Sequence, residues 1–190
     1  MPNTITKTTY FEKPGPENTE ETLKLAKKRA KELNIKNIIV ATTSGETGAK
    51  ASKLFKDYNL IIVSHVTGFK KPDHQELQPK NRNTITKNKA KILTTAHAFG
   101  TIGRAINKKF STIQADGLVA NVLRTFGQGT KVACEISCMA VDAGLIEVCE
   151  DAIAVGGTRS GADTAVVLKP TNTHAFFELK IKEIICKPHL

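Results

Sequence analysis

The sequence predicts an α/β fold, a three-layer α/β/α arrangement around a mostly parallel sheet, built as a single domain over residues 1–190. Apolar runs of strand length alternate with segments of helical periodicity, which is typical of a parallel sheet covered by helices on both faces. The chain has 190 residues, 40% apolar and 24% charged. That length and balance suit one globular domain that needs no cross-links.

The N-terminal third is expected to run helix, strand, helix, strand. Residues 1–18, which carry Pro14, Gly15 and Pro16, are expected to form an irregular lead-in. A helix then begins after Asn18, with Glu21 completing a capping box, and continues at helical spacing to about Leu33. Residues 38–43 and 60–65 are continuous apolar runs and predict two buried strands. A tight turn over 44–48 and a helix to about residue 56 join them.

The remainder of the chain adds three more groups of elements. Residues 66–83 are polar and basic and predict a loop with a short helix, followed by a strand over 90–95. Two helices are expected between residues 113 and 144, broken near Gly127-Gln-Gly129. Strands over 151–157 and 164–168 are expected to be joined by a glycine-containing loop. The last strand, 177–185, alternates charged and apolar residues, so one of its faces should meet water.

The charge is unevenly distributed. The chain carries 28 Lys and Arg against 18 Asp and Glu, a formal net charge of +10, and residues 70–109 hold ten basic and two acidic side chains. Such a basic segment has three alternative interpretations: it binds nucleic acid, it binds an anionic ligand, or it is only a solvated surface. Nucleic-acid binding ranks third among the functions considered, because no helix-turn-helix, RRM or zinc signature is present. An aromatic fraction of 5% also leaves few platforms for base stacking.

Other features exclude membrane and metal functions. No run reaches the roughly 20 apolar residues of a membrane span, and the first residues lack a signal-peptide core. A cytosolic protein without membrane contact is therefore expected. The four cysteines are interpreted as reduced thiols, with Cys134 and Cys138 in the core rather than in a metal site. Glu135 and Asp142 have no evident partner and are interpreted as surface charges.

The clearest motif is the turn Thr42-Thr-Ser-Gly-Glu-Thr-Gly48, between a predicted strand and a predicted helix. Ligands of open parallel sheets bind at the carboxyl ends of strands, and the free amides and dipole of a helix N-terminus attract anions. The glycines permit close backbone approach and the hydroxyls donate hydrogen bonds. The motif predicts a phosphate-binding turn formed by Thr43, Ser44, Gly45, Glu46 and Thr47. It is not a Walker motif, because no Gly-Lys-Ser/Thr follows. The alternative is an ordinary turn capped by Ser44.

Two further glycine-containing segments follow predicted strands and should lie on the same rim. The first segment is Gly156–Asp163. Its Arg159 can pair with a phosphate in bidentate fashion, or the segment is a hairpin loop with an incidental arginine. The second segment is His97–Arg104, in which His97 acts as an acid, a base or a hydrogen-bond donor, or is structural. The candidate ligand-binding residues of these segments are Gly157, Thr158, Gly161, Asp163 and Thr164, and His97, Gly100, Gly103 and Arg104.

The run Ile38–Phe55 and the segment Ala154–Leu168 resemble the C-terminal domain of pyruvate kinase, whose catalytic barrel has no counterpart here. A closer resemblance covers nearly the whole chain and is to the mostly archaeal, stand-alone proteins with this domain. The stretches that carry it are Tyr10–Thr19, Ser44–Thr47, His97–Arg104, Lys131–Ile136, Ala143–Ile146, Gly156–Thr158 and Gly161–Ala165.

The resemblance implies the three-layer fold and FMN as the cofactor, with no settled reaction and no assigned catalytic residue. Three functions are therefore considered. The first is a cytosolic FMN-binding protein, with flavin redox chemistry if the flavin turns over. The second is a non-catalytic module that senses a phosphorylated metabolite, and the third is the basic nucleic-acid binder. The resemblance and the exposed sheet edges also favour a homo-oligomer, although no residue fixes one.

Overall fold

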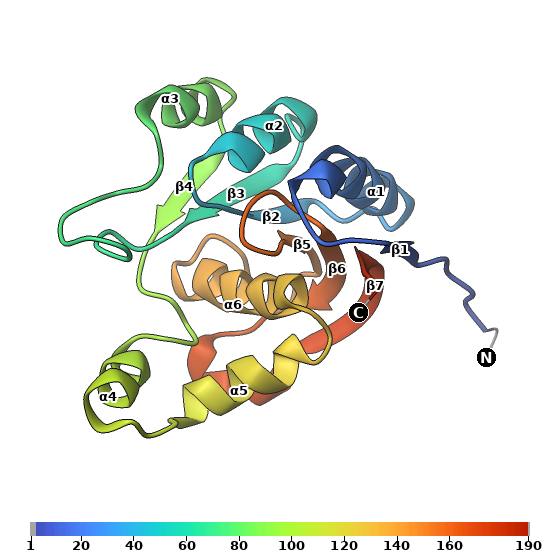
Figure 1. The fold of residues 1–190 in the computed structure, drawn as a ribbon. Helices are drawn as coiled ribbons and strands as arrows, with labels where there is room; N and C mark the ends of the chain where they lie inside the picture. Colours follow the sequence, from blue (N-terminus) through green and yellow to red (C-terminus); the bar gives the residue numbers. More distant parts are fainter. Residues whose placement is uncertain (1–2, 190) are drawn as a thin grey trace.

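The computed structural model describes residues 3–189 and places seven strands in one sheet between helices (Figure 1). The strands are β1 (Thr9–Phe11), β2 (Asn37–Thr42), β3 (Asn59–Ser64), β4 (Lys91–Thr94), β5 (Ala152–Gly156), β6 (Thr164–Lys169) and β7 (Lys180–Pro188). The helices are η1 (Pro16–Asn18), α1 (Thr19–Glu32), α2 (Glu46–Leu54), α3 (Pro79–Lys87), α4 (Ile102–Phe110), α5 (Ala115–Arg124), α6 (Gln128–Asp142) and η2 (Thr173–Glu178).

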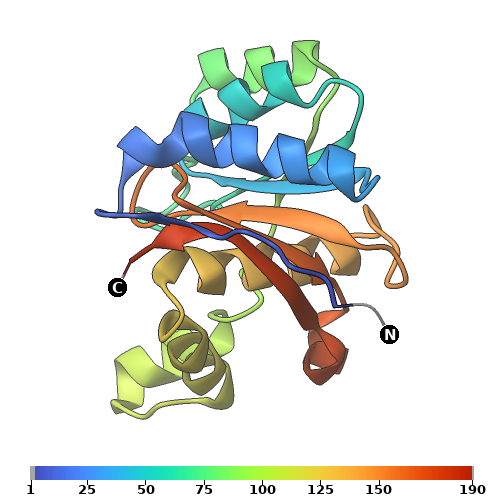
Figure 2. The same ribbon diagram turned by 90° about the vertical axis from the view of Figure 1, so that its right-hand side faces the viewer.

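The sheet has the strand order β1-β7-β6-β5-β2-β3-β4 and is mostly parallel, as predicted. Strand β6 alone runs against the others, because it is paired antiparallel with both β5 and β7. Helices α1, α2 and α3 cover one face, and α6 covers the other with α5 and α4 outside it (Figures 1 and 2). The α/β class expected from the sequence is therefore confirmed.

The two helical layers bury alternate residues of the central strands. Ile38 and Val40 of β2 face the α1–α2 layer, whereas Ile39 faces α6. All three side chains are fully buried, and burial of such a side chain stabilises the fold by about 1.5–3 kcal/mol. Because both faces of β2 are covered, its sequence is continuously apolar rather than alternating.

Several boundaries differ from the sequence prediction. The lead-in is not wholly irregular, because Thr9–Phe11 forms the edge strand β1 beside β7 and Pro16–Asn18 forms η1. Helix α1 begins after Asn18 as expected, but the capping box is not formed, because the Asn18 amide donates to the Lys13 carbonyl at 2.8 Å. The last strand is shifted to 180–188, since residues 173–178 form η2.

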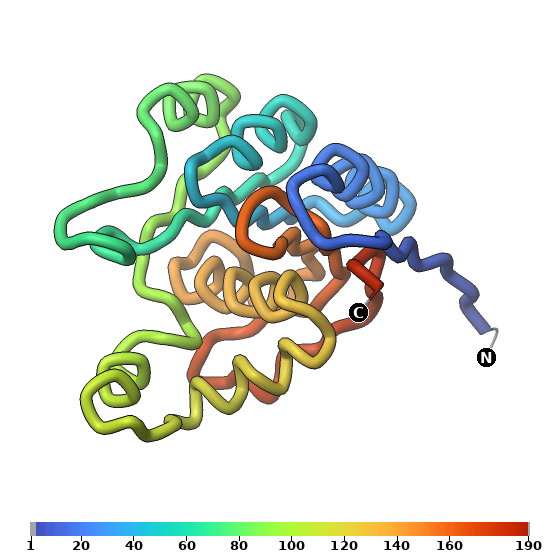
Figure 3. Tube along the Cα trace, viewed as in Figure 1, coloured from blue at the N-terminus to red at the C-terminus, as the bar shows by residue number. Residues whose placement is uncertain are grey.

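Helix α4 is the largest element that was not predicted. It occupies residues 102–110, which begin within the segment interpreted as a glycine-containing rim. The tube in Figure 3 shows this helix and α5 as an arm beside α6, while the long loop between β3 and α3 projects on the same side of the molecule. No helix within residues 3–189 combines the length and the apolar character that crossing a bilayer requires.

Candidate functional site

The main pocket lies at the carboxyl ends of β2, β3 and β5. From β2 the chain passes through α2 to β3 on one side, whereas α6 leads to β5 on the other side and on the opposite face of the sheet. This reversal makes the edge between β2 and β5 a topological switch point, where open α/β sheets bind ligands. A cavity of about 510 Å³ opens there, within the range of small-molecule sites.

The N-terminus of α2 forms one end of this pocket. Gly45 has φ 93° and is the N-cap, so the chain turns from strand into helix through a conformation that favours glycine. The alternative in which Ser44 caps the helix is wrong. The Thr42 hydroxyl accepts from the Gly48 amide at 3.3 Å, and the amides of Glu46 and Thr47 have no hydrogen-bond partner among residues 3–189.

The turn is held by its neighbours in a fixed position. The Ser44 carbonyl accepts from the Gln78 amide at 3.1 Å and from Asn81 Nδ2 at 2.9 Å, which fixes it to the start of α3. Gly48 lets α2 approach β3, since a Cβ there would lie 2.7 Å from Ile62 Cγ2. These contacts fix the position of the turn and do not involve its hydroxyl groups.

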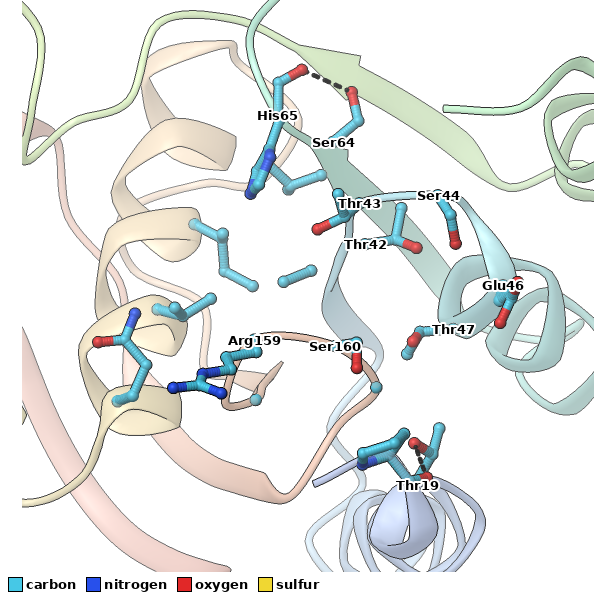
Figure 4. Close-up of a pocket in the computed structure, with 18 of the residues that line it drawn as sticks. Thr19, Thr42, Thr43, Ser44, Glu46, Thr47, Ser64, His65, Arg159 and Ser160 are labelled. Carbon is cyan, nitrogen blue, oxygen red and sulfur yellow. Dashed lines mark hydrogen bonds between the residues drawn. The ribbon is translucent and has the colours of Figure 1, made fainter. Parts of the chain in front are cut away.

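Hydroxyl groups and one cation surround the free amides. Figure 4 shows the side chains of Ser44, Thr47 and Ser160 around one end of the pocket. Lys50, one turn further along α2, also lines it and pairs with Glu20 at 3.1 Å on the surface. The carboxylate of Glu46 is the opposing charge at this end. Free amides, hydroxyls and an ammonium group together form a donor set that suits a phosphate.

The β5–β6 loop brings the second predicted segment to the same pocket. Gly157, Arg159, Ser160 and Gly161 line it, and Arg159, at φ 64°, extends its side chain toward α6 (Figure 4). The structure thus brings together the two segments that the sequence singled out, with the Arg159 guanidinium and the Ser160 hydroxyl as additional donors.

Three residues of this loop that were predicted to bind the ligand do not line the pocket: Thr158, Asp163 and Thr164. Asp163 is fully buried, and its Oδ2 accepts from the amides of Thr158 at 3.1 Å and Gly15 at 3.2 Å. Its Oδ1 accepts from the Thr164 hydroxyl at 2.8 Å. Asp163 therefore fixes the loop and ties it to the segment before α1.

A cluster of aromatic rings lies beyond the end of β3. His65, Phe69 and His97 line the pocket with ring centroids 4.5–5.4 Å apart. His97 Nε2 accepts from the Val66 amide at 3.3 Å, which leaves the proton of the neutral ring on Nδ1. Burial lowers the pKa of His97, so the neutral form is favoured.

His65 is oriented by a carboxylate. Its Nδ1 is 2.8 Å from Glu76 Oε2, and Lys70 Nζ is 2.5 Å from the other oxygen of Glu76. Burial alone would raise the pKa of Glu76, but the hydrogen bonds from Lys70 and His65 outweigh it and lower that pKa. The Glu76 carboxylate is therefore charged and holds the imidazole in place.

Helix α6 supplies an apolar wall with one carboxylate in it. Val132, Ile136 and Met139 line the pocket beside Glu135. Glu135 is 5% exposed, its Oε1 accepts from the Phe99 amide at 3.0 Å, and its Oε2 lies 2.5 Å from Lys131 Nζ.

The interpretation of Glu135 as a surface charge is wrong, because it forms a buried ion pair one turn along α6. Burial lowers the pKa of Lys131, and Glu135 opposes that effect. Asp142, the other carboxylate of the helix, is exposed and accepts hydrogen bonds from Asn172 and Thr173. The lysine four residues before Glu135 was the signal in the sequence that would have identified the pair.

The residues of the 97–104 segment line two different cavities. His97 lines the main pocket, whereas Gly100, Gly103 and Arg104 line a smaller cavity of about 170 Å³ between α4 and α5. The expectation of a single shared rim is therefore wrong for these three residues. Arg104 still contacts the main site indirectly, because its guanidinium lies 4.9 Å from the centroid of Phe69.

The buried cysteines are as expected. Cys134 and Cys138 are fully buried on α6, and burial raises the pKa of each thiol to about 12. Both pack in the cluster between α5 and α6.

Fold and site together define an α/β protein with a pocket of small-molecule size at the carboxyl edge of its sheet. A family model described as "Pyruvate kinase, alpha/beta domain" matches residues 20–168. The chain therefore belongs to the family of the pyruvate kinase alpha/beta domain, in agreement with the resemblance seen in its sequence.

Solved structures include similar chains at low identity. Two crystal structures of pyruvate kinase from Cryptosporidium parvum share 17% and 18% identity with this chain, with TM-scores of 0.42 and 0.39. The matches cover 80% and 84% of this chain and 23% of each enzyme, so the chain spans less than a quarter of their length. An O-ureido-L-serine synthase matches 66% of this chain and 48% of its own at 14% identity, with a TM-score of 0.32.

Proposed function

We propose that this protein binds FMN, with the phosphate at the N-terminus of α2 and the ring system against α6. One observation carries the proposal: a single cavity joins a phosphate-type donor set to an apolar wall. The Glu46 and Thr47 amides and the Ser44, Thr47 and Ser160 hydroxyls lie at one end. Val63, Val132, Ile136 and Met139 lie at the other.

The apolar end also contains the polar groups that a flavin ring needs. The Glu135 carboxylate, fixed by Lys131 and the Phe99 amide, is an acceptor for a ring N–H. The Nδ1–H of neutral His97 is a donor for a ring or substrate oxygen. When bound, FMN would supply hydride or single-electron chemistry. The residues around it would orient the ring and exclude water.

A phosphorylated metabolite is the second candidate ligand, and the protein would then be a sensor rather than an enzyme. The observation that favours it concerns the phosphate-type donors, which come from the turn before α2, from α2 itself and from the β5–β6 loop. This end of the pocket can therefore bind a phosphate that carries no flavin ring. We place the protein in the cytosol in either case, where free cysteines such as its four remain reduced.

The test is an absorption spectrum of the purified protein, repeated after FMN is added and unbound flavin is removed by desalting. We expect a retained flavin band in the parent. The Ser44→Ala, Thr47→Ala double variant should bind FMN at least about 100-fold more weakly, because each of the two lost hydrogen bonds to the charged phosphate contributes about 1.5–3 kcal/mol. Riboflavin, which lacks the phosphate, should bind parent and variant equally.

The control is Thr86→Ala, at an exposed threonine of α3 outside the pocket, which should leave FMN affinity unchanged. Equal FMN affinity in the parent and the double variant would remove the phosphate assignment. A parent that retains no flavin would reject FMN. A thermal-shift screen of sugar phosphates would then test the sensor.

A further inference from the structure

The arm formed by α4 and α5 carries most of the large apolar side chains that are more than half exposed in residues 3–189. Between residues 102 and 126, six large apolar side chains are more than half exposed: Ile102, Phe110, Ile113, Leu118, Val122 and Phe126. Helix α4 buries no residue, and Ala120 is the buried residue of α5. Exposed apolar residues are common singly, but a group of this size marks an interaction surface.

The exposed large apolar side chains of α5 lie on one face of the helix. Val119, Ala120 and Leu123 pack inward in the cluster that α5 shares with α6 and η2. Leu118 and Val122 of α5, and Phe126 in the turn that follows the helix, are spaced four residues apart and are 51–63% exposed, so they form a stripe on the outer side. Figure 1 shows α5 lying outside α6, with no element covering its outer side.

We infer that this stripe is a homodimer interface, in which α5 of one copy packs antiparallel against α5 of a second copy around a two-fold axis. A repeat of four residues is the ridge that interdigitates with an identical ridge in the commonest class of helix packing. A two-fold axis near residues 120–122 places each stripe against itself, so one patch serves both subunits.

Charge also favours a second copy over other occupants. The chain carries a net charge of +10, yet residues 110–130 contain one acidic and one basic side chain, Asp116 and Arg124. Two copies therefore meet at a surface with no net charge. In the antiparallel arrangement Asp116, in the first turn of α5, lies at the same end as Arg124 of the partner subunit, in its last turn, and the two helix dipoles are also opposed.

The experiment is analytical ultracentrifugation of the full chain over a range of concentrations, without added ligand. We expect a species of twice the 20.6 kDa chain mass. Val122→Lys should weaken the dimer by at least about 100-fold, because the two-fold axis places the new charge twice in the centre of an apolar interface.

The matched control is Val148→Lys, at a valine that is 39% exposed and lies outside the arm. It should leave the dimer intact, and circular dichroism should show that both variants fold. A parent that stays monomeric at high concentration would overturn the inference, as would a Val122→Lys variant that dimerises like the parent. Loss of binding to anionic lipid vesicles in Val122→Lys, with a monomeric parent, would assign the stripe to a membrane surface instead.

Discussion

The buried pair of Lys131 and Glu135 allows the proposed ligand-binding role of Glu135 to be tested separately from its structural role. The two side chains are 5% and 7% exposed, and Glu135 also holds the Phe99 amide. Removing one member of such a pair leaves an uncompensated buried charge and costs about 3–5 kcal/mol. We therefore expect Lys131→Met to lower the free energy of unfolding by that amount, and Glu135→Gln by an amount nearer the lower limit.

The double variant Lys131→Met, Glu135→Gln should be within about 1 kcal/mol of the parent. It buries no charge, and the new amide oxygen can still accept from Phe99 N–H. Urea unfolding of all four proteins measures the coupling, which should be at least about 5 kcal/mol, because each single change costs about 3 kcal/mol or more and the double change about 1 kcal/mol or less. Additive effects of the two single changes would refute the view that the pair acts as a unit.

The same double variant tests the ligand, because it is expected to fold. If the Glu135 carboxylate accepts the ring N–H of FMN, the parent should bind FMN about 10-fold more tightly than FMN methylated at that nitrogen. The double variant should bind both flavins with similar affinity. A parent that does not discriminate between them would reject the role of Glu135 while leaving FMN binding itself intact.

Three further predictions follow from local packing and burial. Gly48→Ala should destabilise the protein by about 1–3 kcal/mol in urea unfolding, because the new methyl would meet Ile62 at 2.7 Å and Ile85 at 3.0 Å. Gly117→Ala, with open space around it, should be neutral or slightly stabilising. The lowered pKa of His97 means that the unfolded chain takes up its proton first as the pH falls below about 6.5. Acidification from pH 7.5 to 5.5 should therefore remove up to about 1.4 kcal/mol of stability that His97→Asn does not lose. Finally, Cys149 is exposed, whereas burial raises the pKa of the Cys134, Cys138 and Cys186 thiols to about 12. One thiol should thus react quickly with a disulfide reagent at pH 8, and three only after denaturation.

The central strands could be predicted from sequence because both faces of β2 and β3 are buried, which produces continuous apolar runs. Helix α4 could not, because its apolar residues Ile102 and Phe110 are exposed and Gly100 and Gly103 suggested a loop. The strand β1 is three residues long and exists through its pairing with β7, in which Thr9 pairs with Cys186, a contact that local sequence does not encode.

The candidate site was predictable where the chain itself carries the chemistry. The free amides after Gly45 follow from a strand, a glycine turn and a helix in that order. The β5–β6 loop follows from the same reasoning. The contributions of Phe69 and Glu135 depend on how a long loop folds back and which face of α6 meets the sheet. These are tertiary facts, and spacing along the chain does not determine them.

The strand order has a consequence for synthesis on the ribosome. Strands β2, β3 and β4 emerge in sequence and can pair at once, but β2 must wait for β5, whose register with it joins Asn37 to Ala152. During the intervening hundred or so residues one edge of an apolar central strand stays open. Open edges of this kind recruit other chains. The nascent protein should therefore depend on chaperones most strongly before residues 152–156 are made.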